Sequence, residues 1–150
     1  MENLRGGCSC GSVRFELADD PLWVLACHCD ACKKRTGSAY GVAVMVGNQT
    51  VKEFSGKTRT FTRIGDSGNK IHYDFCPDCG TTLRWHVDIV PGRQAFAGGT
   101  FDDMNLLSDC VASQAGCHGF ASLAMALRMV RSLRMQATMA TIFGLPAVMR

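Results

Sequence analysis

Hydrophobic and polar residues alternate with a period of two along several short stretches of the first hundred residues. The alternating stretches are 11–17, 58–63, 70–75 and 81–87, and a more continuous apolar run covers 40–46. In the first stretch, Val13, Phe15 and Leu17 share one face. Clusters of Gly, Asn and Asp separate the stretches, for example at 65–68. Short strands with regular turn signals predict a mainly β domain, which we expect to be an antiparallel β-sandwich.

The composition changes abruptly after residue 103. Residues 1–103 contain twelve Lys/Arg and twelve Asp/Glu, whereas residues 104–150 contain four Arg and one Asp, so the formal charge of +3 comes from the C-terminal part. Apolar residues at helical spacing across 120–135, with arginine at every third position from 128 to 134, predict an amphipathic helix there. We therefore expect a β domain over 5–103 and an Ala/Met/Arg-rich tail over 104–150. A divergent C-terminus or a shifted reading frame would each explain the change.

Composition and charge exclude several classes of protein. With 47% hydrophobic and 19% charged residues, the chain is not of the disordered type. The balanced charges of residues 1–103 give no basic patch for nucleic acid, and no apolar run is long enough for a membrane span. The first residues lack the basic and apolar regions of a secretory signal, so we expect a cytoplasmic protein.

Cysteine is the most unusual feature of the composition. Nine cysteines are an odd number, which suits a disulfide framework poorly, and in a reducing compartment clustered cysteines more often bind metal. Seven of them form three tight groups: Cys8 with Cys10, Cys27 with Cys29 and Cys32, and Cys76 with Cys79. Thiolates at these spacings meet on one ion when a turn folds them together, and Zn²⁺ is the first candidate for such sulfur-rich sites.

The numbers of cysteines suggest two different sites. The two pairs, Cys8/Cys10 and Cys76/Cys79, would close one tetrahedral structural site that joins the first strand to a distant hairpin. The remaining group would hold a second ion with three protein ligands and an open fourth position, where a substrate or water binds. An iron–sulfur cluster, one zinc with a redox-active triple, and ordinary buried cysteines remain as alternatives.

With their flanking residues, these groups resemble the glutathione-dependent formaldehyde-activating enzyme family, which shares its domain with centromere protein V. The matching segments are 7–14, 27–32, 36–38, 54–56, 75–80 and 98–103. The resemblance implies a mostly β fold with two zinc ions. It implies that Cys8, Cys10, Cys76 and Cys79 hold the structural zinc, and that Cys27, Cys29 and Cys32 hold the catalytic one. It further implies carbon–sulfur lyase chemistry, with the addition of glutathione to formaldehyde as the named reaction.

A basic run directly follows the group Cys27, Cys29 and Cys32, called the triple below. Lys33, Lys34 and Arg35 are expected to moderate the negative charge of the thiolates and to pair with the carboxylates of glutathione, while a solvated basic run is the alternative interpretation. The partners expected are a small-molecule thiol and an aldehyde, with no nucleic acid and no membrane, and the sequence leaves a homo-oligomer open. A zinc-binding module that recognises a protein partner is the second hypothesis for function.

Overall fold

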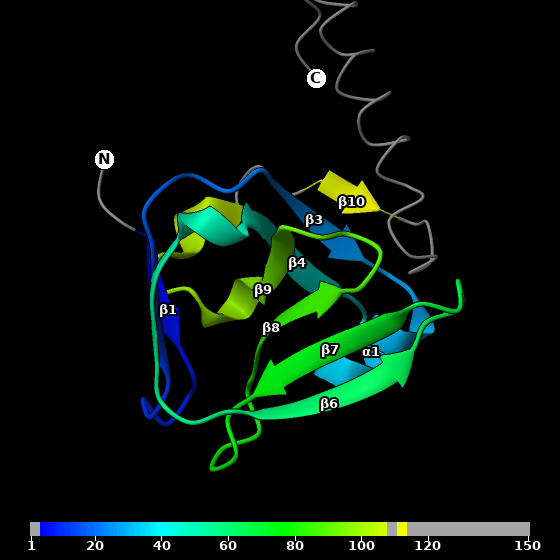
Figure 1. Cartoon of the computed structure of the whole chain (residues 1–150), viewed down its shortest axis with the longest axis horizontal. Helices are drawn as coiled ribbons and strands as arrows, with labels where there is room; N and C mark the ends of the chain where they lie inside the picture. The colour runs from blue at the N-terminus through cyan, green and yellow to red at the C-terminus, as the bar shows by residue number, and fades with distance from the viewer. Residues whose placement is uncertain (1–3, 108–110, 114–150) are drawn as a thin grey trace, which may run out of the picture. The chain divides into compact units, whose positions relative to one another are not determined.

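The computed structural model describes residues 4–107 and 111–113, so the helix expected over 120–135 lies outside the described residues. The described part contains, in chain order, β1 (Leu4–Gly7), β2 (Arg14–Leu17), β3 (Trp23–Cys27), α1 (Asp30–Thr36), β4 (Gly41–Gly47), η1 (Asn48–Thr50), β5 (Val51–Ser55), β6 (Arg59–Ile64), β7 (Lys70–Phe75), β8 (Thr82–Val87), β9 (Arg93–Ala97), η2 (Gly98–Thr100), η3 (Met104–Leu107) and β10 (Val111–Ser113) (Figure 1). None of the helices in this part is long and apolar enough to cross a membrane.

The strands form two sheets. The smaller has the order β1-β2-β5 and the larger β10-β3-β4-β9-β8-β7-β6. Neighbouring strands run antiparallel except β10, which pairs in parallel with β3 in the register Val111↔Leu25 to Ser113↔Cys27. The prediction of a mainly β fold with antiparallel sheets is therefore confirmed. β7 has the predicted bounds, while the predicted stretch 11–17 is a strand only from Arg14 onward.

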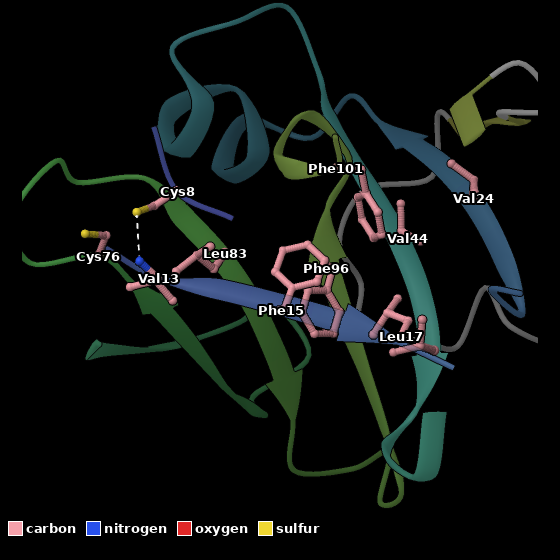
Figure 2. Close-up of a cluster of buried hydrophobic side chains, with 11 residues drawn as sticks. Cys8, Val13, Phe15, Leu17, Val24, Val44, Cys76, Leu83, Phe96 and Phe101 are labelled. Atoms are coloured by element: carbon pink, nitrogen blue, oxygen red, sulfur yellow. Dashed lines mark hydrogen bonds between the residues drawn. The ribbon is translucent and has the colours of Figure 1, made fainter. Parts of the chain in front are cut away.

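The hydrophobic core lies between the smaller sheet and the central strands of the larger one. Val13, Phe15 and Leu17, predicted to share one face, are at most 3% exposed. Phe15 packs on Phe96 of β9 with ring centroids 4.5 Å apart and on Phe101 at 5.1 Å (Figure 2). Because these rings come from both sheets, their burial joins the two layers.

The side chains of β7 and β8 alternate between two environments. Tyr73 and Trp85 are opposite one another in register, are buried, and have ring centroids 5.8 Å apart on the face where α1 lies. Arg84, the neighbour of Trp85 in the chain, has its guanidinium 3.8 Å from the ring of Phe54 in β5. Strand β8 therefore has α1 on one face and the smaller sheet on the other, a consequence of the period-two geometry of strands.

Candidate functional site

The first cluster of sulfur atoms joins two hairpins that are far apart in the sequence. The Sγ atoms of Cys8, Cys10, Cys76 and Cys79 all lie within 4.8 Å of one another. Cys8 Sγ is 3.4 Å from Cys10 Sγ, and Cys10 Sγ is 3.7 Å from Cys76 Sγ. Four thiolates at about 2.3 Å from one Zn²⁺ would stand roughly 3.8 Å apart in a tetrahedron. The number, type and spacing of these sulfur atoms therefore fit a closed zinc site.

Tight turns bring each pair of cysteines together. The backbone N–H of Gly11 donates to the carbonyl of Cys8 at 3.0 Å, and that of Gly80 donates to the carbonyl of Cys76 at 2.9 Å. Both glycines have a positive φ, of 80° and 72°, which other residues rarely adopt. The N–H of Val13 donates to Cys8 Sγ at 3.2 Å (Figure 2), so the turn itself orients this sulfur atom.

Thr81 connects the two hairpins beside the cluster. Its hydroxyl lies 3.2 Å from Cys79 Sγ and accepts a hydrogen bond from the N–H of Ser9 at 3.2 Å. Hydrogen bonds from the Thr81 hydroxyl and then from the Thr81 backbone lower the pKa of Cys79 to about 5. At Cys79, the thiolate form that a metal cation requires is therefore favoured at neutral pH.

The second cluster consists of Cys27, Cys29 and Cys32, whose Sγ atoms also lie within 4.8 Å of one another. Cys27 is the last residue of β3, and Cys29 is the N-cap of α1, accepting a bond from the N–H of Cys32 at 3.4 Å. Cys27 and Cys32 are buried and Cys29 is half-buried. Three thiolates fit the type of zinc site that keeps one coordination position for water or substrate.

Helix α1 is defined by its two ends. The Cys29 carbonyl accepts from the N–H of Lys33 at 3.0 Å, and Gly37 closes the helix in a left-handed conformation with φ of 64°. An acidic residue lies in the first turn and the basic run in the last turn, as the helix dipole favours. The same run therefore also stabilises the helix that contains Cys32 and has Cys29 as its N-cap.

The three basic residues lie in different surroundings. Lys33 and Lys34 are exposed, and Lys33 forms an ion pair with Asp30 at 3.4 Å. The guanidinium of Arg35 lies over the ring of Trp85, with its Cζ 4.4 Å from the ring centroid. Its buried Nε makes no hydrogen bond within the described part of the chain. A Cβ added at Gly41 would contact both Arg35 Nη2 and Cys32 Cβ, so Arg35 is the member of the run that lies beside the three-cysteine cluster.

Two residues close to the triple were not assigned a role from the sequence. Tyr73 lies 5.7 Å from the Arg35 guanidinium, and burial raises its pKa above the ordinary value. Together with Trp85 it forms the aromatic surface under Arg35. The alternation of residues 70–75 and 81–87 placed both rings on apolar faces, but no sequence signal placed α1 against those faces.

The comparisons with known proteins agree with this picture. The sequence model of the family described as glutathione-dependent formaldehyde-activating enzyme matches residues 3–117. The crystal structure of a Rhodobacter sphaeroides protein superposes with a TM-score of 0.55 at 15% sequence identity, covering 73% of this chain and 99% of that one. At this identity the superposition shows a common fold.

Proposed function

This chain belongs to the glutathione-dependent formaldehyde-activating enzyme family, and from that premise we propose that it is a zinc-dependent carbon–sulfur lyase. Its reaction joins glutathione and formaldehyde to S-hydroxymethylglutathione, or splits the adduct. The thiol sulfur bonds to the aldehyde carbon, the carbonyl electron pair moves to oxygen, and the thiol proton ends on that oxygen. The observation that supports this proposal best is a three-sulfur cluster separate from a four-sulfur cluster.

In this proposal Cys27, Cys29 and Cys32 hold the zinc ion at which the reaction takes place. A zinc ion bound there would supply Lewis acidity, which lowers the pKa of a coordinated thiol toward neutrality. Burial of Cys27 and Cys32 keeps water away from most of the cluster. The half-buried Cys29 lies on the more accessible side, and we expect the thiol substrate to approach there.

Arg35 has an electrostatic role in the same proposal. Three thiolates and one Zn²⁺ have a formal charge of −1, and a substrate thiolate would make it −2. The Arg35 guanidinium, fixed over Trp85 and Tyr73, places a positive charge beside these groups. The N–H groups of the planar guanidinium can also donate hydrogen bonds to a carboxylate of glutathione.

The test combines metal content with activity. We expect two zinc ions per chain, falling to one in Cys29→Ser without loss of the fold, because the four-sulfur cluster does not include Cys29. Formation of S-hydroxymethylglutathione, followed by NMR, should exceed the uncatalysed rate for the wild type and return to it in Cys29→Ser. The matched control Ser38→Ala alters an exposed residue after α1 and should change neither.

Two results would contradict the proposal. Loss of both zinc ions in Cys29→Ser would mean that the clusters are not independent sites. Two zinc ions with no acceleration in the wild type would instead favour a zinc-binding module that recognises a protein partner.

A further inference from the structure

A third cluster of metal-ligand residues contains no cysteine and lies on β7 and β8. His72 and His86 are paired directly across the two strands, with ring centroids 4.7 Å apart and planes inclined by 17°. Asp88 follows β8 on the same face as His86, and its N–H bonds to the carbonyl of Lys70. One ligand atom from each of His72, His86 and Asp88 lies within 4.8 Å of the others.

Hydrogen bonds fix the orientation of the His72 ring. Its Nδ1 is 2.9 Å from the hydroxyl oxygen of Thr62 on β6, and its Nε2 is 2.9 Å from a carboxylate oxygen of Asp88. Thr62 can donate to Nδ1 or accept from it, because a hydroxyl does both. In the neutral ring, Nε2–H donates to the Asp88 carboxylate, which only accepts, and the Thr62 hydroxyl donates to Nδ1. A metal ion on Nε2 would take the place of that proton, and the ring would then carry its proton on Nδ1, where the Thr62 hydroxyl can accept it.

We propose that His72, His86 and Asp88 bind a borderline divalent transition-metal ion such as Zn²⁺, at a site separate from both cysteine clusters. Imidazole and carboxylate donors are the set that such ions accept. Donors at about 2.0–2.2 Å from zinc stand roughly 3.3–3.6 Å apart in a tetrahedron, so the 2.9 Å between Nε2 and the Asp88 oxygen would have to lengthen by about half an ångström. Thr62 is a positioning residue: with a metal ion on Nε2, its hydroxyl would accept the hydrogen bond from Nδ1–H, as hydrogen-bond partners of metal-bound histidine commonly do.

The surroundings leave space for water on the ion. His86 and Asp88 line a cavity of about 400 Å³ formed with the loop between β8 and β9. Arg84 and Arg93 also line this cavity, but each is held by another group. Arg84 pairs with Asp74 at 2.9 Å, and the guanidinium of Arg93 lies 5.4 Å from the ring centroid of Trp23. The positive charges of the two arginines are thus partly offset by these contacts. Water molecules in the cavity can complete the coordination of the metal ion.

The test uses the full chain carrying the zinc that it retains through gel filtration. Titration calorimetry with added Zn²⁺ should reveal one further equivalent, whose Kd rises at least tenfold in His86→Ala and in Asp88→Asn. The control Asp66→Asn removes an exposed carboxylate from the turn between β6 and β7, and should leave that Kd unchanged. Thr62→Val keeps all three ligands and should weaken binding by roughly 10- to 100-fold, because only the support of His72 is lost.

Nitrogen NMR of the imidazole rings supplies an independent readout. On addition of Zn²⁺, the resonances of His72 Nε2 and of one His86 nitrogen should shift, and the proton of the His72 ring should be found on Nδ1 instead of Nε2. No further equivalent of Zn²⁺ up to millimolar concentration would overturn the proposal. A further equivalent bound equally well by His86→Ala and Asp88→Asn would also overturn it. Because Asp88 and Thr62 are exposed, their variants remain informative even if the His86 variant does not fold.

Discussion

Among single residues, Arg35 has two kinds of neighbour. Its guanidinium lies over the rings of Tyr73 and Trp85, and it also approaches the triple: a Cβ added at Gly41 would meet Arg35 Nη2 at 2.9 Å and Cys32 Cβ at 3.3 Å. Stacking on aromatic rings contributes about 0.5–2 kcal/mol and reduces the number of rotamers that the long side chain samples. A binding group fixed in this way loses less entropy when a ligand arrives.

We therefore expect Arg35→Gln to raise the KM for glutathione at least tenfold, about 1.4 kcal/mol, because the charge beside the thiolates is lost. Lys34→Gln removes a neighbouring exposed charge and should change KM less than twofold. Steady-state kinetics at saturating formaldehyde measures both values. Equal effects of the two variants would show that the basic run acts only through its total charge.

Phe15 is the central residue of the aromatic core. It is 3% exposed and packs against Phe96 and Phe101. Phe15→Ala should lower the free energy of unfolding by about 3–5 kcal/mol, because the cavity left behind cannot close fully. Phe61→Ala, at a side chain 59% exposed on β6, should change it by less than about 0.5 kcal/mol. Urea denaturation measures the free energy of unfolding of both variants. Similar decreases in the two would show that Phe15 contributes no more to stability than an exposed aromatic side chain.

At the scale of secondary structure, the strands with alternating patterns and the continuous apolar run 40–46, which is β4 (Gly41–Gly47), were predictable, whereas β3 and β9 were not. β7 appears at its predicted residues, β6 is shifted by one residue, and β8 begins one residue later than predicted. β3 and β9 have five residues each, and their sequences, WVLAC and RQAFA, do not alternate between apolar and polar residues, so the period-two pattern does not mark them. Helix α1 has seven residues, about two turns, which is too short for a recognisable hydrophobic periodicity, and its N-cap is a cysteine thiol, which is not among the usual capping signals.

The same contrast applies to the candidate site. The grouping of seven cysteines into sets of four and three followed from their numbers and spacing, and the sulfur atoms are indeed gathered in these two sets. Thr81 beside Cys79, and the aromatic rings under Arg35, depend on how distant strands and α1 pack. The pairing of His72 with His86 likewise depends on the register of β7 and β8. None of these relations is encoded locally in the sequence.

Glu16 gives the smaller sheet a dependence on pH. Its carboxylate accepts hydrogen bonds from Lys52 of β5 and Arg5 of β1, and these contacts, Lys52 first, hold the pKa of Glu16 below its ordinary value. The stabilisation is present above the pKa of an unfolded glutamate, about 4.3, and is lost as pH falls through the lower pKa of the folded state.

The stability difference between wild type and Glu16→Gln should therefore shrink as pH falls from about 6 to about 3. Urea denaturation at a series of pH values measures this difference, with Asp66→Asn as a variant outside the contact. A difference that stayed constant over this range would show that the carboxylate charge does not stabilise the sheet.

At the scale of the whole molecule, the four-cysteine cluster ties the first hairpin to the turn between β7 and β8. Structural zinc sites contribute about 10–16 kcal/mol of apparent binding free energy, comparable to the total stability of a domain. Chelation should therefore lower the Tm of the wild type by roughly 10 °C or more. Without chelator, Cys79→Ser should already have the Tm of the chelator-treated wild type, and chelator should change it little. Cys29→Ser should respond to chelator as the wild type does. Differential scanning calorimetry with and without chelator tests this order.

The positions of the two cysteine clusters along the chain also determine when each can form during synthesis. The three cysteines of the triple lie at the end of β3 and in the first turn of α1, within six consecutive residues. All three are therefore available as soon as this short segment has left the ribosome. The other cluster must wait for Cys79 and then close a long loop, whose entropic cost rises only slowly with its length. The sulfur atoms that we expect to meet substrate are therefore available to metal before those that we expect to hold the two hairpins together.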